Sequence, residues 1–254
     1  MAKRLKGKVA LITGSSSGIG AGVAKAYARE GADIVLNYPD KAGERDIWEI
    51  QKAIEKMGRK ALVAKADVSD EGQVKRMVSQ ALKTFGKVDI LVNNAGHADR
   101  GAPLQDMSVE MFDRMIAVHL RGTFLCTKYV LPHMYKNDYG KIINVSTQFA
   151  FGGTPLFTHY NAAKAGVIAM THTLAIEVGE RNINVNCVAM GATRTPMVDQ
   201  VPPEKPKSVL ARQTKHRFGD VDKDIVPAFV FLASEDSRFF VGQTLGPNGG
   251  DVFS

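Results

Sequence analysis

The stretch "VALITGSSSGIGAGVAKAYAREGADIVL" (residues 9–36) indicates the fold of the chain. It begins with a short apolar run, passes through a glycine-rich turn into a segment of helical period, and ends in a second apolar run. This order is typical of a strand, a tight turn, a helix and a second strand. Gly14, Gly18 and Gly20 stand where the chain must turn sharply, approach a phosphate closely and pack a helix against a sheet. The stretch predicts the first unit of a parallel sheet with a phosphate-binding turn.

The same alternation continues along the rest of the chain. Short β-branched runs predict strands at residues 9–13, 33–38, 61–68, 88–94, 140–146, 183–189 and 244–249. The segments between them predict helices near residues 19–30, 43–57, 70–85, 108–136, 160–179 and 222–233. We therefore expect an α/β fold, a doubly wound parallel seven-stranded sheet of Rossmann type with helices on both faces. No linker divides the chain, so we expect a single domain over residues 1–254, with a proline-rich mobile lid at about 194–220.

The composition excludes several classes of protein. Hydrophobic residues make up 44% of the chain and charged residues 23%, which is the profile of a soluble globular protein. The net charge is +7, but the Lys and Arg residues are mixed with Asp and Glu along amphipathic segments, so we expect no nucleic-acid partner. Cys126 and Cys187 lack metal-ligand spacing, and the apolar run at the N-terminus is too short for export or insertion. We expect a cytoplasmic protein without a metal or a membrane partner.

Five motifs, taken in order, carry a resemblance to a known family. They are "TGSSSGIG" (13–20), Asp67-Val68, "NNAG" (93–96), "YNAAK" (160–164) and "GATRTPM" (191–197). Each motif is common alone, but their order and spacing resemble those of the short-chain dehydrogenase/reductase family from about residue 5 to residue 250. The resemblance implies a nicotinamide-dependent oxidoreductase.

The resemblance also implies which residues contact the cofactor. Beside the three turn glycines, Ser16, Ser17 and Ile19 would contact its phosphates and ribose, and Asp67 and Val68 would flank the adenine. The remaining implied contacts are Asn94, Ala95 and Gly96 on the ribose side, Thr195 at the nicotinamide amide, and Tyr160 and Lys164.

The end of the second predicted strand bears on the choice of cofactor. A carboxylate there would bond the ribose 2′-OH and repel a 2′-phosphate, but Asn37 and Tyr38 occupy the site. This absence favours NADP. Asp40 adds a negative charge nearby, whereas Lys41 and Arg45 would compensate it, so NAD remains the alternative.

Tyr160 and Lys164 form the candidate proton-transfer pair, since residues four apart share one helix face. The pKa of a tyrosine is about 10, and a nearby ammonium is expected to lower it. Such a tyrosine can take a proton from an alcohol, or give one to a carbonyl, while hydride moves to or from a nicotinamide.

Two further positions depart from the family pattern. The family usually keeps a serine thirteen residues before the tyrosine, and here that position holds Thr147, with Ser146 beside it. Strand alternation turns the two hydroxyls to opposite faces, so we expect only one, Thr147, to serve. His119 stands where the family carries an asparagine that supports a proton relay. Its imidazole either keeps that relay and makes it sensitive to pH near 6.5, or disables it.

The expected substrate is a small alcohol or carbonyl compound. Its walls are predicted at residues 97–100, at Gln148, Phe149, Phe151 and Phe157, and on the lid at 196–216, where Lys205, Lys207, Arg212 and Lys215 would favour an anion. The stretch "TPLFTHYNAAK" is similar to glucose dehydrogenases, and the layout equally resembles 3-oxoacyl carrier-protein reductases. The alternative is a cofactor-binding regulatory or assembly subunit with little turnover, suggested by His119, Thr147 and Met190.

The last expectation is a homotetramer. The predicted helices at 108–136 and 160–179 carry apolar residues on more than one face, which two-fold pairing would bury. The family resemblance implies that these helices pair and that the C-terminal segment forms a second interface.

Overall fold

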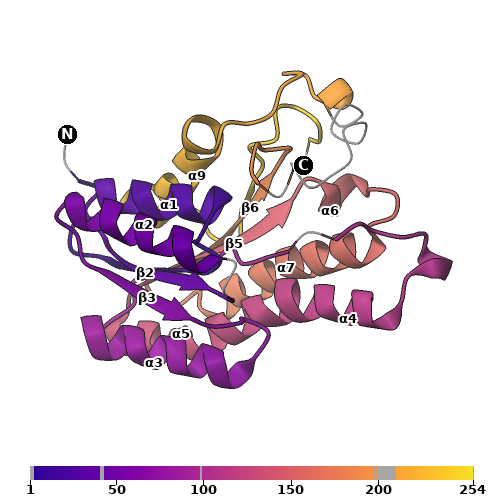
Figure 1. Ribbon diagram of the computed structural model, residues 1–254. Coiled ribbons are helices and arrows are strands. Elements are labelled where there is room, and N and C mark those ends of the chain that lie inside the picture. The colour runs from indigo at the N-terminus through magenta and orange to yellow at the C-terminus, as the bar shows by residue number, and fades with distance from the viewer. Residues whose placement is uncertain (1–2, 41–42, 98, 197, 199–209, 254) are drawn as a thin grey trace.

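The computed structural model describes residues 3–40, 43–97, 99–196, 198 and 210–253, without the side chain of residue 45. Within these residues seven strands form one sheet in the order β3-β2-β1-β4-β5-β6-β7 (Figure 1), and all neighbours are parallel. They are β1 (Val9–Ile12), β2 (Asp33–Tyr38), β3 (Ala61–Lys65), β4 (Ile90–Asn93), β5 (Gly140–Thr147), β6 (Ile183–Met190) and β7 (Thr244–Leu245). The predicted doubly wound, seven-stranded parallel sheet is confirmed.

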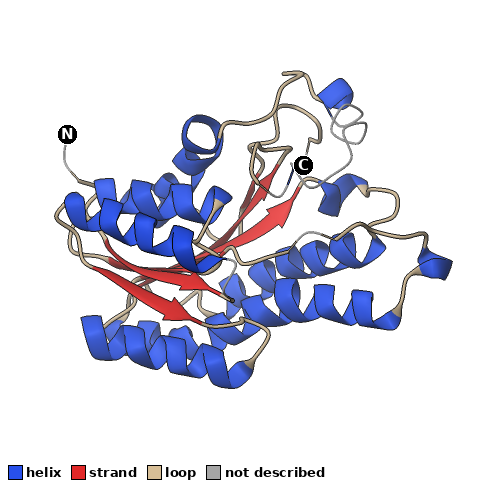
Figure 2. Cartoon of the chain, in the orientation of Figure 1, coloured by secondary structure: helices blue, strands red, loops and turns tan. Residues whose placement is uncertain are grey.

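Helices cover both faces of the sheet (Figure 2). One face carries α1 (Gly18–Arg29), α2 (Glu44–Lys56) and α9 (Val226–Ala233), and the other carries α3 (Glu71–Phe85), α5 (Gly122–Asn137) and α7 (Thr158–Glu177). Successive strand residues face opposite layers, so Ala10 and Ile12 pack in the first core and Val9 and Leu11 in the second. This two-sided burial explains why the strands are apolar throughout rather than alternating.

The predicted helix at 108–136 contains a break in its hydrogen-bond pattern. It consists of α4 (Val109–Ile116), a π-helical turn at Ala117–Arg121, and α5, which follows at once. A π-helical turn accommodates an extra residue without ending the helix, and such turns are frequent at functional sites. Here the turn contains His119.

Three details differ from the sequence prediction. Strand β7 covers only two residues of the predicted 244–249, because Pro247 has no N–H to continue the ladder. A short helix, α6 (Phe149–Gly152), follows β5 where no element was expected, and α9 begins after a second π-helical turn at Val221–Ile225. Residues 197 and 199–209 of the predicted lid, with Lys205 and Lys207, lie outside the described residues.

The strand order places the site. Neighbouring strands β1 and β4 lead into connections that run to opposite sides of the sheet, which opens a crevice at their carboxyl ends. The glycine turn follows β1, "NNAG" ends β4, and Ser146 and Thr147 end β5 at this same edge.

Candidate active site

Two glycines of the turn, Gly14 and Gly20, stand where a side chain would not fit. Gly14 has φ +61°, and a Cβ there would lie 2.8 Å from Cα of Ala95. A Cβ on Gly20 would lie 2.4 Å from the carbonyl oxygen of Gly14 and 2.6 Å from Nδ2 of Asn94. Helix α1 begins at Gly18, and its N-cap Ser17 makes no side-chain capping bond. The turn thus exposes backbone N–H groups at a helix N-terminus, which fits the pyrophosphate of a dinucleotide.

Asn37 supports this turn from the end of β2. Its Oδ1 accepts the N–H of Gly14 at 3.0 Å, and its Nδ2 donates to the carbonyl of Ala66 at 2.9 Å. The side chain is 1% exposed, so its bonds go to the backbone rather than outward. Tyr38, also buried, follows it, and a Cβ on Gly43 would touch Oγ of Ser16 at 2.7 Å, which brings Ser16 to the same end of β2.

The residues after β3 and β4 complete this side of the crevice. Asp67 accepts hydrogen bonds from Ser69 and Arg114; burial opposes ionisation, but these bonds outweigh it and hold the pKa of its carboxyl below the ordinary value. Val68 is buried, and a Cβ on Gly122 at the start of α5 would lie 2.7 Å from its Cγ2. The Ala95 N–H donates to Thr13, and Asn94 donates from Nδ2 to the carbonyls of Thr13 and Gly14.

Two elements bring the catalytic candidates together. Tyr160 and Lys164 lie one turn apart on α7, which packs against β5. Lys164 donates from Nζ to the carbonyl of Val145 at 2.8 Å and lies 5.9 Å from the centre of the Tyr160 ring. The Thr147 hydroxyl lies near enough to the Tyr160 phenol to oppose the rise of its pKa, whereas Ser146 donates to the carbonyl of Lys164 at 2.9 Å. The two adjacent hydroxyls therefore have different partners.

The electrostatics of Tyr160 differ from the sequence expectation. Burial raises the pKa of Tyr160 to about 12, and the hydrogen bond with Thr147 only partly opposes the rise. Burial also lowers the pKa of Lys164 to about 8. The prediction that Lys164 lowers the tyrosine pKa is wrong for this state, because its ammonium is bonded to Val145 and both groups lose hydration.

His119 projects from the π-helical turn to the site. Its Nε2 lies 3.2 Å from the backbone N of His97, and its ring meets the ring of Tyr160 edge-on at 5.4 Å between centres. A Cβ on Gly96 would lie 2.5 Å from Cε1 of His119, so only glycine fits there. Nδ1 of His119 is buried and has no hydrogen-bond partner among the described residues.

The predicted titration of His119 near pH 6.5 is wrong. Burial, followed by the charge of Lys164, lowers the pKa of His119 well below its ordinary value. The imidazole is therefore neutral at neutral pH. A neutral ring with an unpartnered nitrogen retains the capacity to take part in a proton relay.

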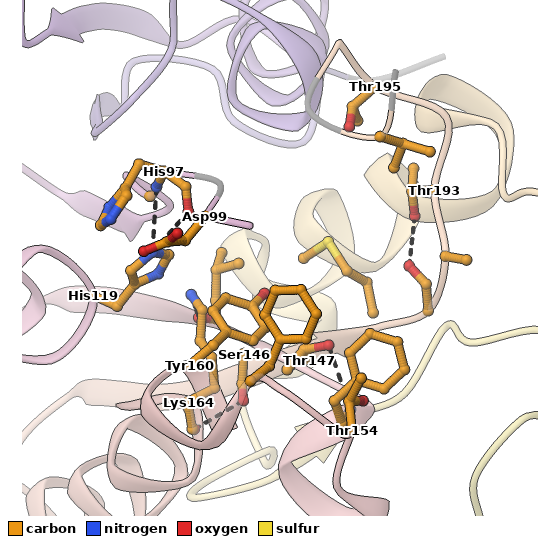
Figure 3. A pocket seen from close by; sticks show the side chains of 18 of the residues that line it. His97, Asp99, His119, Ser146, Thr147, Thr154, Tyr160, Lys164, Thr193 and Thr195 are labelled. Atoms are coloured by element: carbon orange, nitrogen blue, oxygen red, sulfur yellow. Dashed lines mark hydrogen bonds between the residues drawn. The ribbon is translucent and has the colours of Figure 1, made fainter. Parts of the chain in front are cut away.

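A cavity of about 470 Å³ lies in front of these residues. Figure 3 shows Tyr160, Lys164, Ser146 and Thr147 on its floor, with His97, Asp99 and His119 at one end and Thr193 and Thr195 toward the other. Thr195 lies against Gly18, so the cavity reaches the glycine turn, and Ile19, Asn94 and Gly96 also line it. Its other walls are mostly apolar, and include Pro155, Leu156, Met190, Val198 and Phe218.

Some of the residues predicted to form the substrate walls line this cavity. His97, Asp99, Phe149 and Phe157 line the cavity. Gln148 and Phe151 do not, because Gln148 is buried and Phe151 points outward with 43% of its surface exposed. The sequence analysis did not predict Leu156 and Phe218, which reach the cavity from loops. Leu156 has φ +73°, a left-handed conformation that the neighbouring sequence does not predict.

Metal and membrane features are lacking in the described part of the chain. No group of three or more His, Cys, Asp or Glu side chains is arranged there to hold a metal ion. Nor does the described part include a helix that is long and apolar enough to span a membrane.

The comparisons with known proteins agree with this geometry. Residues 14–251 match the family model described as enoyl-(acyl carrier protein) reductase. A hydroxy(phenyl)methylsuccinyl-CoA dehydrogenase subunit of Thauera aromatica is 41% identical, with 97% of each chain covered. A 3-oxoacyl-(acyl-carrier-protein) reductase of Thermotoga maritima is 39% identical, with 98% of this chain and 99% of that protein covered. The solved structure of a protein from Sinorhizobium meliloti, titled a short-chain alcohol dehydrogenase, has a TM-score of 0.91 at 31% identity and covers 99% of this chain and 98% of its own.

The chain therefore belongs to the short-chain dehydrogenase/reductase family. It is an oxidoreductase of the kind that uses NAD(P).

Proposed function

We propose that the protein interconverts an alcohol and a carbonyl compound by hydride transfer, with Tyr160 as the acid and base. The observation that carries the proposal is the meeting of the Tyr160 phenol and the Thr147 hydroxyl on the floor of a cavity that reaches the glycine turn. The printed names of two relatives, one with a hydroxyl group and one with a 3-oxo group, describe the two sides of such a reaction.

The side chains on the floor of the cavity suit reduction of a carbonyl. A bound nicotinamide supplies the hydride. Thr147 and Tyr160 each donate a hydrogen bond to the substrate oxygen, and Tyr160 passes its proton to that oxygen as negative charge develops there. A phenol with a pKa of about 12 is protonated at neutral pH, as a proton donor must be. The Lys164 ammonium, one helical turn away, is bonded to the carbonyl of Val145 in this state and would stabilise the remaining phenolate only after leaving that carbonyl.

His119 is proposed as part of the proton supply. Its neutral imidazole touches the edge of Tyr160 and retains one buried, unpartnered nitrogen. A water held there would link the ring to Lys164, whose charge already acts on it. This role does not need His119 to change its charge.

We also propose a preference for NADPH over NADH. Neither residue at the end of β2 is acidic, and Asn37 is committed to the turn. Because Tyr38 rather than an acidic residue stands there, the end of β2 has no carboxylate to bind a free 2′-OH or to repel a 2′-phosphate. We expect the preference to be several-fold rather than many orders of magnitude, because Asp40 stays nearby.

The substrate is proposed to be apolar or ring-bearing around the reacting carbon. Phe149, Leu156, Phe157 and Phe218 make the walls, and such walls favour hydrocarbon over sugar surfaces. This argues for a ketone or alcohol with a hydrocarbon frame over glucose.

A panel of ketones and alcohols assayed with NADPH and NADH tests these proposals. We expect turnover of small cyclic or aryl ketones, with kcat/KM several-fold higher for NADPH. Acyclic 3-oxoacyl thioesters serve as the comparison class. Absence of turnover with every ketone and alcohol, despite measurable cofactor binding, would leave the proposal without support.

We propose that the protein is a cytoplasmic homotetramer. Its two cysteines are buried and free, which fits a reducing compartment. Exposed apolar side chains include Phe112 on α4, Phe124 on α5 and Ile176 on α7, and Phe239 and Val241 extend the exposed apolar surface near the C-terminus. Exposed apolar side chains on the helices and near the C-terminus suit the interfaces that a tetramer needs.

A further inference from the structure

The polar end of the cavity differs in chemistry from its other walls. Figure 3 shows His97, Asp99 and His119 clustered there, away from Thr193 and Thr195. Apart from the catalytic floor, the remaining walls are mostly hydrocarbon. Among the cavity-lining residues that the structure describes, Asp99 is the one carboxylate.

Asp99 has hydrogen-bonding capacity left over. Its Oδ1 accepts the N–H of Arg100 at 2.6 Å, while its Oδ2 lies 3.5 Å from Nε2 of His159 without forming a hydrogen bond. A carboxylate accepts several hydrogen bonds, so one backbone donor does not saturate it. The Asp99 side chain is 21% exposed, which leaves it accessible from the cavity.

His159 lies against this carboxylate and is completely buried. Neither of its ring nitrogens has a hydrogen-bond partner among the described residues, although both are shielded from solvent. Buried polar groups are rarely left unpaired. Asp99 therefore offers free acceptor capacity to the cavity, and the buried ring of His159 lies behind it, with Nε2 3.5 Å from Oδ2.

The histidine rings beside Asp99 do not offer a cation to an anionic substituent, and Arg114, whose charge reaches His97, is engaged by Asp67 and Ser69. Burial lowers the pKa of His97, and burial lowers that of His119 far more, so neither ring is charged at neutral pH. The Lys164 ammonium donates to Val145 at the floor of the cavity. A carboxylate on the substrate would therefore meet Asp99 as a like charge, whereas a hydroxyl would find acceptors.

We propose that Asp99, backed by His159, is a specificity-determining residue that binds a hydroxyl group on a neutral substrate and disfavours a carboxylate in the same place. The proposal rests on the proposed function, and it names the substrates of that site as hydroxylated or otherwise uncharged cyclic ketones and the corresponding alcohols. Asp99 acts on the substituent and takes no part in proton transfer.

The test compares ring ketones that differ in one substituent. Purified full-length protein is assayed with NADPH on cyclohexanone, on 3- and 4-hydroxycyclohexanone, and on 3- and 4-oxocyclohexanecarboxylate. We expect kcat/KM for the better hydroxyketone to exceed that for the better carboxylate by about tenfold or more, since a site built for a hydroxyl discriminates strongly. Asp99→Asn should reduce this ratio to about threefold or less, with cyclohexanone changed by less than about threefold.

Asp106→Asn is the matched control. Asp106 belongs to the same connection after β4, is exposed and does not line the cavity, so its variant should keep the parent's ratio. The substrate ratio within one variant is the readout, because a merely structural defect would lower all activities together. NADPH binding by Asp99→Asn, followed by fluorescence, should match that of the parent.

Each outcome bears on one proposal or the other. Equal or better use of the carboxylates by the parent, or an unchanged ratio in Asp99→Asn, overturns the role of Asp99 while ketone reduction stands. Failure to reduce any ketone, with NADPH binding intact, overturns the proposed function and this inference with it.

Discussion

The two neighbouring hydroxyls at the end of β5 have different roles in the structure. Ser146 donates to the backbone of α7 through the carbonyl of Lys164, and so helps to hold that helix against the sheet. The hydroxyl of Thr147 lies near enough to the phenol of Tyr160 to oppose the rise of its pKa. The extra methyl group of a threonine does not remove the donor that a substrate oxygen needs. We propose Thr147 as the catalytic hydroxyl on this ground.

Paired variants test that assignment. Thr147→Ala should lower kcat about a hundredfold, which is typical for loss of one donor to a developing oxyanion. Ser146→Ala should lower kcat less than about fivefold and reduce stability by about 1 kcal/mol, through loss of one buried hydrogen bond. Thr147→Ser, which keeps the hydroxyl, should retain most of the activity. Steady-state kinetics with thermal unfolding of all three would separate the roles, and a larger activity loss in Ser146→Ala would reverse them.

Among the elements, the glycine turn and α1 form the part of the site that the sequence specifies most fully. The close approach of Gly20 to Gly14 and Asn94 makes glycine a steric requirement. The amide of Asn37 then holds the turn by bonding Gly14. Cofactor binding should therefore respond to a single methyl group in this turn.

Gly20→Ala should weaken NADPH binding more than tenfold, because its Cβ would lie 2.4 Å from a backbone oxygen that cannot move aside cheaply. Gly152→Ala is the control, since its Cβ would meet only Val252 at 3.7 Å. Fluorescence titration with NADPH, alongside thermal unfolding, measures both variants. An unchanged dissociation constant for Gly20→Ala would show that the turn does not carry the phosphates.

The elements also show how far sequence alone can lead. Periodicity predicts β1, α1 and β2 well, because their apolar residues are set by burial on both faces of the sheet. It does not reveal the π-helical turn at His119, since one extra residue barely disturbs a helical pattern. The lining of the cavity is harder to predict from the sequence, because Leu156 and Phe218 come from loops whose paths depend on tertiary packing. Gln148 illustrates the converse error, a polar side chain expected in the cavity but buried beside it.

At the scale of the whole molecule, many apolar residues of the predicted helices at 108–136 and 160–179 belong to the core. Buried residues include Met115, Leu125, Val130, Val167 and Leu174. What remains outside is a smaller set, with Phe124 at 48% exposure and Ile176 at 83%. A single domain over residues 1–254 and a tetramer both stay predictions.

Sedimentation at micromolar concentration tests the tetramer. The expected mass is about four times that of one 27.5 kDa chain. Ile176→Glu should lower the assembled mass without unfolding the chain, because that side chain is 83% exposed and contributes little to the core. A monomeric parent protein would contradict the prediction.

The most direct test of the whole account is the rate of ketone reduction by Tyr160→Phe. The change removes the phenolic oxygen that donates the proton but leaves the glycine turn and the aromatic ring in place. We predict a loss of kcat of a hundredfold or more, with the dissociation constant for NADPH changed by less than about threefold. A variant that keeps more than about a tenth of the parent's kcat would contradict the assignment of Tyr160 as the acid and base.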